Sequence, residues 1–236
     1  MSAAVEKPWQ AEGEQKRVAV RNLFADIAPS YDLLNTLMSF GLHHLWRRDA
    51  VRKLDLHPGD SVLDICCGTG DFLLPLRNAV GDKGHVEGLD FCSPMLAIAE
   101  KKVKGRARLT LGDATHLPHA SGLFDAATVG WGLRNVPDLG AALREANRVL
   151  KPGGKFICLD MTQSDKGIGR KAFEAIVPIL GKLFGKTDAY AYLPKSTEKF
   201  TDKIGLAQAM RDAGFEKVDY KSLFFGNIAM HWGVKP

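Results

Sequence analysis

The sequence predicts an α/β fold in which a largely parallel sheet carries helices on both of its faces. Strand-like apolar runs alternate with helix-like segments from residue 61 onward, and this alternation favours parallel strands joined by crossover helices. The first run ends in a glycine-rich turn, Gly68-Thr69-Gly70, which is typical of the sheet edge where ligands bind. A length of 236 residues suits one domain with a small extension.

Each element follows from its local pattern. Short apolar runs predict strands over residues 61–66, 85–90, 107–111, 124–129 and 155–159. Helical spacing predicts helices over residues 71–80, 93–102 and 139–150. Ser93 is the expected N-cap of the second helix, and Lys151-Pro152-Gly153-Gly154 is expected to end the third before the fifth strand begins. Right-handed crossovers should then place every strand-to-helix turn along one edge of the sheet.

Two regions stand outside this alternation. Residues 14–55 read as entirely helical, so residues 1–55 are expected to form an N-terminal helical lid on a main domain of residues 56–236. Residues 163–201 are expected to form a helical insertion after the fifth strand. The tail then predicts a helix over 206–213 and a hairpin of strands over 215–223 and 225–232, which gives the sheet an antiparallel last strand.

Composition narrows the class of protein. The 32 Lys and Arg residues exceed the 27 Asp and Glu residues by only five, which is too mild a balance for a nucleic-acid partner. No apolar run is long enough to cross a bilayer, and the N-terminus lacks the apolar core of a secretory signal. The four cysteines show no CxxC spacing, which favours a reducing, cytoplasmic location and no metal centre.

The loops after the strands carry the chemistry. The turn at Gly68 lets the backbone approach a ligand closely, but Leu73 replaces the third glycine of a dinucleotide fingerprint and weakens a diphosphate-binding interpretation. Asp90 ends the next strand, at the position expected of an acid that accepts hydrogen bonds from both ribose hydroxyls. Asp113 and Ala114 follow the third strand, where a carboxylate and a backbone N–H can meet an adenine ring. The sequence therefore predicts a nucleoside pocket.

Five segments carry a family resemblance: VLDICCGTGD, GLDFCSPML, GDATHLP, FDAATVGWGLRN and RVLKPGG. Together they resemble class I S-adenosylmethionine-dependent methyltransferases. Residues 20–48, VRNLFADIAPSYDLLNTLMSFGLHHLWRR, and the GLRN at 132–135 are similar, more narrowly, to quinone-biosynthesis C-methyltransferases that act on demethylmenaquinone or on polyprenyl-methoxy-benzoquinol. The resemblance implies a Rossmann-like methyltransferase sheet, S-adenosylmethionine as the methyl donor and a prenylated quinol as the substrate.

The resemblance also implies site residues. Thr69, Asp90, Asp113 and Ala114 are the expected cofactor contacts. Gly68 and Asp64 would shape the same pocket, Gly130 would approach the cofactor, and Met95 would pack on the adenine or simply belong to the core. Three positions depart from the family pattern, because Cys66 stands where many methyltransferases have Gly, His44 where a basic residue is common and Gly130 where Ser is common.

A quinol ring carbon becomes nucleophilic when a neighbouring hydroxyl loses its proton, and a phenol with a pKa near ~10 needs help to do so. The resemblance places Arg134 at the quinol oxygen, where a guanidinium would stabilise the phenolate or orient a water rather than accept a proton. Asn135 is expected to hold the second oxygen or that water. Tyr31 and His43 from the lid are expected to complete the site, and only His43 has an ordinary pKa suited to a base.

Several alternatives stay open from the sequence. Another class I methyltransferase, a nicotinamide-dependent oxidoreductase and a non-catalytic nucleoside-binding regulator are the competing functions. A naphthoquinol is favoured over a benzoquinol, while the chain length of the prenyl group and the oligomeric state, including a homodimer, are undetermined. Residues 167–186 predict a basic amphipathic helix that could lie on the inner face of a membrane, cover the substrate, form a dimer face or pack in the core.

Overall fold

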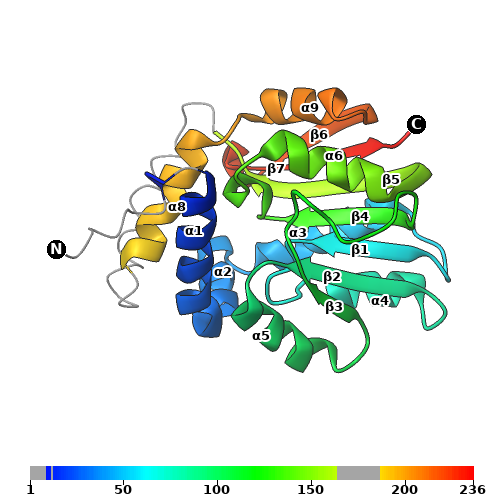
Figure 1. The fold of residues 1–236 in the computed structure, drawn as a ribbon, viewed down its shortest axis with the longest axis horizontal. Coiled ribbons are helices and arrows are strands. Elements are labelled where there is room, and N and C mark those ends of the chain that lie inside the picture. The colour runs from blue at the N-terminus through cyan, green and yellow to red at the C-terminus, as the bar shows by residue number, and fades with distance from the viewer. Residues whose placement is uncertain (1–8, 12, 164–186) are drawn as a thin grey trace.

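The sheet is the frame of the molecule. The computed structural model describes residues 9–11, 13–163 and 187–236, and its strands form one sheet in the order β3-β2-β1-β4-β5-β7-β6 (Figure 1). The strands are β1 (Ser61–Ile65), β2 (His85–Asp90), β3 (Arg108–Leu111), β4 (Phe124–Gly130), β5 (Leu150–Met161), β6 (Glu216–Leu223) and β7 (Ile228–Val234). The first five are parallel to one another, and β7 lies antiparallel to both β5 and β6. The predicted fold class and the antiparallel end of the sheet are therefore confirmed.

Helices cover both faces of the sheet, as Figure 1 shows for the front face. The helices of the main domain are α3 (Leu42–Leu54), α4 (Leu73–Val80), α5 (Ser93–Val103), α6 (Leu139–Val149) and α9 (Lys203–Asp212). Successive strand residues point to opposite faces, so Val62 packs with side chains of α3 and α4, while Leu63 packs with those of α6 and α9. The strands are thus buried on both sides, which explains why they read as continuous apolar runs.

Two local predictions were wrong. Ser93 is the first helical residue of α5 rather than its N-cap, because the chain is still extended at Cys92, whose amide donates to Asp90 Oδ1 at 2.9 Å. The fifth strand was predicted to begin after the Pro-Gly stretch, at residue 155, but it begins at Leu150, directly after α6. Backbone hydrogen bonds that join Gly153 and Gly154 to Lys235, both 2.9 Å long, hold this stretch in the sheet.

The N-terminal segment is helical, as predicted. α1 (Gly13–Ile27) passes through the short turn η1 (Ala28–Ser30) into α2 (Tyr31–Ser39), and α3 leads on to the first strand. Figure 1 shows α1 and α2 gathered with α8 (Thr187–Lys199) at one end of the sheet. The amphipathic segment expected at 167–186 lies outside the described residues. Among the helices that the structure does describe, none has the length and apolar character needed to span a membrane.

Candidate active site

Two cavities lie where the N-terminal helices meet the sheet. The first, here called the loop cavity, encloses about 660 Å³ and is lined by the loops that follow β1, β2, β3 and β4, together with Arg17, Phe24 and Tyr31 of the N-terminal segment. It therefore lies at the carboxyl ends of the parallel strands, the edge at which the sequence predicts ligand binding. Gly68, Asp90, Met95, Asp113, Ala114 and Gly130 line it, as the sequence predicts.

Asp90 is the best-defined polar group of the loop cavity. Its Oδ2 accepts from the backbone N–H of Gly68 at 2.8 Å and its Oδ1 from that of Cys92 at 2.9 Å. Burial raises the pKa of this carboxyl to about 6, although the backbone hydrogen bonds oppose the shift. A carboxylate oxygen can accept more than one hydrogen bond, so both oxygens keep acceptor capacity for a ligand with two neighbouring hydroxyls.

Two other predicted residues shape the loop cavity. Asp113 Oδ1 accepts from the amide and the hydroxyl of Thr115 at 2.8 and 2.7 Å, while Oδ2 lies 3.8 Å from a terminal nitrogen of Arg17, which also lines the cavity. Gly130 must lack a side chain, because a Cβ there would lie 2.8 Å from the ring of Phe72. A Ser side chain at position 130 would need that ring to move.

Thr69 and Asp64 lie elsewhere than expected, since neither lines the loop cavity. The Thr69 hydroxyl donates to Asp32 Oδ1 at 2.5 Å and so holds the turn against the lid. The Asp64 carboxyl accepts from the Thr128 hydroxyl at 2.7 Å inside the sheet, where burial raises its pKa to about 7. Both side chains therefore support residues next to the loop cavity without lining it.

Cys66, which also departs from the family pattern, lines the loop cavity and has a φ of 57°. This left-handed conformation costs a residue with a Cβ about 1–2 kcal/mol relative to Gly. A left-handed backbone at position 66 is thus more easily adopted by Gly than by Cys.

The second cavity, here called the lid cavity, encloses about 910 Å³ between the N-terminal helices, the turn η2 (Leu133–Asn135), α8 and β7. Most of its wall is apolar, including Leu23, Ile27, Leu34, Met38, Trp46 and Ile228. None of the described side chains that line it is an Asp or a Glu. Phe24, Tyr31 and Trp131 line both cavities, so the two meet at these three rings.

Arg134 projects from η2 into the wall of the lid cavity and is 6 % exposed. One terminal nitrogen donates to Asp160 Oδ1 and to the Trp131 carbonyl, both at 2.8 Å. Its Nε has no hydrogen-bond partner among the described atoms. Burial is the largest single effect and opposes the charge, but the attraction and the hydrogen bond of Asp160, together with smaller contributions from Tyr192 and Tyr31, raise the pKa of the guanidinium. Arg134 is therefore a fixed positive charge that can donate hydrogen bonds but cannot act as a base.

Asn135 and Tyr31 are brought close to Arg134. The Asn135 side chain lines the loop cavity rather than the lid cavity, and its Oδ1 accepts from the Tyr192 hydroxyl at 2.8 Å. Burial raises the pKa of Tyr31 above its ordinary value, and raises the pKa of Tyr192 to about 12. Both phenols are thus protonated at neutral pH and can donate hydrogen bonds.

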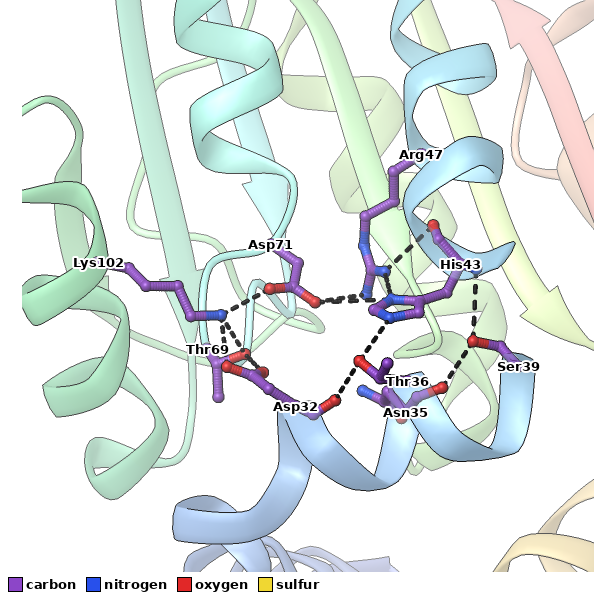
Figure 2. A network of polar contacts seen from close by, with 9 residues as sticks. All are labelled: Asp32, Asn35, Thr36, Ser39, His43, Arg47, Thr69, Asp71 and Lys102. Atoms are coloured by element: carbon purple, nitrogen blue, oxygen red, sulfur yellow. Dashed lines mark hydrogen bonds and ion pairs between the residues drawn. The ribbon is translucent and has the colours of Figure 1, made fainter. Parts of the chain in front are cut away.

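His43 lines the lid cavity, but its environment argues against the base role that its ordinary pKa suggests. The Thr36 hydroxyl donates to the Asp32 carbonyl at 2.8 Å, so at 3.2 Å from His43 Nε2 it must accept a proton from that nitrogen. Nδ1 is then the acceptor, and Arg47 donates to it. Burial, followed by the charge of Arg47, lowers the pKa of His43 to about 4. With both nitrogens engaged and the ring neutral, His43 holds Arg47 in place (Figure 2).

Sequence reasoning missed Arg47 and Trp131. The Arg47 guanidinium is buried at 3.3 Å from Asp71 Oδ2 and lies 4.5 Å above the Trp131 ring. Trp131 itself has a φ of 59°, which is rare for so bulky a residue and common at functional sites. A signal was available for Arg47, because His43 and Arg47 are four residues apart and share one face of α3.

The strand order and the position of the loop cavity define the class I methyltransferase fold. A solved S-adenosylmethionine-dependent methyltransferase from Aquifex aeolicus has this fold, with a TM-score of 0.63 and 18% identity, over 83% of this chain and 92% of that one. The profile of the ubiE/COQ5 methyltransferase family matches residues 10–235. The chain belongs to this family.

Two similar proteins are demethylmenaquinone methyltransferases. The one from Alkalihalophilus pseudofirmus is 42% identical over 231 residues, covering 94% of this chain and 98% of the relative. The one from Bacillus cytotoxicus is 42% identical over 233 residues, with the same coverage. Among the described residues of this chain, no group of three or more His, Cys, Asp or Glu side chains is arranged to hold a metal ion.

Proposed function

We propose that the protein transfers a methyl group from S-adenosylmethionine to a ring carbon of a reduced prenylated naphthoquinone, demethylmenaquinol. The observation that carries the proposal is the junction of the two cavities at Phe24, Tyr31 and Trp131. A ligand of the loop cavity and a ligand of the lid cavity can meet there. The names of the similar proteins support the substrate class.

The loop cavity suits the cofactor. Asp90 would accept from the two ribose hydroxyls, Asp113 and Ala114 would face the adenine, and Met95, which is buried in the cavity wall, would pack against its ring. When bound, S-adenosylmethionine supplies a methyl group whose carbon–sulfur bond breaks with the electron pair left on sulfur. Gly68 and Gly130 leave two places in the cavity wall without side chains.

The lid cavity suits the quinol. Its apolar wall can bury the fused ring and the first part of the prenyl chain, and that burial favours binding by roughly 25 cal/mol for each Å² removed from water. Arg134 would hold its positive charge beside the quinol hydroxyl and lower the pKa of that group. The resulting phenolate supplies electrons to the neighbouring ring carbon, which gains the methyl group and then loses its own proton to restore the aromatic ring.

Proton removal from the hydroxyl falls to a group other than His43, Tyr31 or Tyr192. The first is neutral with both nitrogens engaged, and the two phenols are held in their protonated forms. Because none of the described lid-cavity side chains is a carboxylate, we propose that a water molecule beside Arg134 takes the proton.

The test is methyl transfer from labelled S-adenosylmethionine to prenylated naphthoquinol and benzoquinol, each supplied in reduced and oxidised forms. We expect transfer to the reduced naphthoquinol and none to either oxidised quinone, because the oxidised ring has no hydroxyl to ionise. Equal transfer to reduced and oxidised forms would contradict the phenolate mechanism. No transfer to any of the four would contradict the proposed function, and preference for the benzoquinol would correct the substrate.

Membrane contact through residues 167–186, a cytoplasmic location and a homodimer remain predictions of the sequence. The long apolar chain of the proposed substrate supports a contact with lipid. Co-sedimentation with anionic vesicles would test that contact.

A further inference from the structure

The lid cavity contains a second buried guanidinium that the proposed reaction does not yet use. We propose that Arg47 binds the quinol oxygen across the ring from the one at Arg134, and so restricts the enzyme to substrates with two para oxygens. The inference rests on the proposed function and deepens it. Arg134 comes from the turn after β4, whereas Arg47 comes from α3 in the N-terminal segment, so the two charges reach the cavity from different parts of the chain.

The two arginines are held in parallel ways. Each is paired with an aspartate, Arg47 with the partly buried Asp71 at 3.3 Å and Arg134 with the fully buried Asp160 at 2.8 Å. Each has an Nε without a hydrogen-bond partner among the described atoms, and each side chain is at least nine-tenths buried. A buried N–H without a partner costs about 1–3 kcal/mol, so two of them around one cavity point to ligand atoms that accept from them.

Both arginines also touch Trp131, at the junction with the loop cavity. Arg134 donates to its carbonyl, while Arg47 lies 4.5 Å above its ring. The charges of both lower the pKa of the Tyr31 hydroxyl, although burial dominates and raises it. The two positive charges therefore converge on the place where the ring of the substrate has to lie for methyl transfer.

Arg47 is held in position before any ligand arrives (Figure 2). His43 Nδ1 accepts from one terminal nitrogen of Arg47, and the proton on His43 Nε2 is directed to Thr36. Because His43 is neutral, it orients the guanidinium without adding a competing charge. The aspartate behind Arg47 is itself held by Lys102 at 2.6 Å. Such fixed donors stabilise charge on a substrate oxygen without the cost of reorganisation.

The competing explanation is that Arg47 only fastens the lid to the turn after β1 through Asp71. The two roles differ in one measurable respect. A residue that binds the second oxygen matters only for a substrate that has this oxygen, whereas a fastening residue matters equally for all substrates.

The experiment compares two substrates: prenylated 1,4-naphthoquinol, and the prenylated 1-naphthol that keeps the hydroxyl beside the accepting carbon but lacks the other. For the unmodified protein we expect kcat/KM to fall about 10- to 100-fold when the second hydroxyl is removed, as for a hydrogen bond to a charged group. Two variants are compared with it, Arg47→Lys and the charge-balanced pair Arg47→Gln with Asp71→Asn. The pair leaves the net charge of the site unchanged. Arg48→Gln, on the exposed side of the same helix, is the matched control.

We expect the charge-balanced pair to use both substrates about equally. Arg47→Lys should lose most of the preference for the naphthoquinol over the naphthol, because a compact ammonium cannot replace the planar set of N–H donors of a guanidinium. Arg48→Gln should discriminate as the unmodified protein does. Calorimetry with S-adenosylmethionine checks that each variant is folded. An equal loss for both substrates, or an unmodified protein that does not discriminate, would overturn the role of Arg47. An unmodified protein that methylates neither substrate would instead overturn the proposed function.

Discussion

The loop cavity and the lid cavity adjoin each other, but they are built in different ways. The loop cavity is formed by consecutive strand-to-helix loops, and its key contacts are backbone N–H groups and glycines that follow directly from β1, β2 and β4. The lid cavity is assembled from the N-terminal helices, the turn after β4, α8 and β7, and its polar groups are long side chains held by partners far away in the sequence. The first is therefore a property of the fold, while the second depends on tertiary packing.

The largest expected effect comes from the lid cavity. Arg134→Ala should lower turnover by about 100- to 1000-fold, the usual loss on removing one preorganised donor at a developing negative charge. S-adenosylmethionine binding should be retained, because Arg134 lines the lid cavity and not the loop cavity. Steady-state methyl transfer and calorimetry together check this prediction.

The variant also leaves Asp160 buried without its partner, at a cost of about 3–5 kcal/mol in the free energy of unfolding. Arg134→Gln with Asp160→Asn avoids that cost, and Arg144→Ala, exposed on α6, is the control. Near-normal turnover of the quinol by the balanced pair would remove Arg134 from the chemistry.

The next effect tests the loop cavity through pH. Burial raises the pKa of Asp90 to about 6 from 3.8, so the ligand-free fold favours the protonated form. Its contribution to stability is then complete below pH 3.8 and is lost as the pH rises through about 6. Ribose hydroxyls donate to the ionised form, so cofactor affinity should change in the opposite sense and fall as the pH drops through about 6.

Calorimetric titration with S-adenosylmethionine across this range is the measurement, with a limiting slope of about tenfold per pH unit. Asp90→Asn should bind weakly at every pH. Asp64→Asn should keep the pH dependence, since Asp64 lies behind the cavity wall. If the pH dependence of cofactor affinity disappears in Asp64→Asn instead, the titrating carboxyl is that of Asp64, and its assignment to Asp90 is wrong.

The smallest effect concerns the contact between the two regions. Thr69→Val removes the hydroxyl that donates to Asp32 at 2.5 Å and accepts from Lys102 at 3.2 Å. We expect the free energy of unfolding to fall by about 1 kcal/mol, with cofactor affinity little changed. Chemical denaturation and calorimetry check the two halves of this prediction.

Thr69→Ser, which keeps the hydroxyl, is the matched control for the valine variant. If Thr69→Val loses cofactor affinity and Thr69→Ser keeps it, the hydroxyl binds the cofactor directly, as the family resemblance implies.

The same difference between the two regions decided what could be predicted. The strands, the antiparallel end of the sheet and the placement of Asp90 and Asp113 followed from local patterns, because a strand ending in a polar loop determines its own position at the sheet edge. The errors at Ser93 and Leu150 were shifts of an element boundary by a few residues, caused by the hydrogen bond that Asp90 accepts from Cys92 and by the backbone hydrogen bonds with the distant Lys235.

The sequence by itself determined the sheet, the position of the predicted nucleoside pocket at one edge of it, and the choice of the arginine after β4 as a site residue. Only the tertiary structure decided that His43 is neutral and positions Arg47, and that Thr69 faces the lid. The reason is physical: the pKa and the free lone pairs of a side chain depend on burial and on partners that folding brings together. Burial, followed by the charge of the arginine four residues further along α3, lowers the pKa of the histidine.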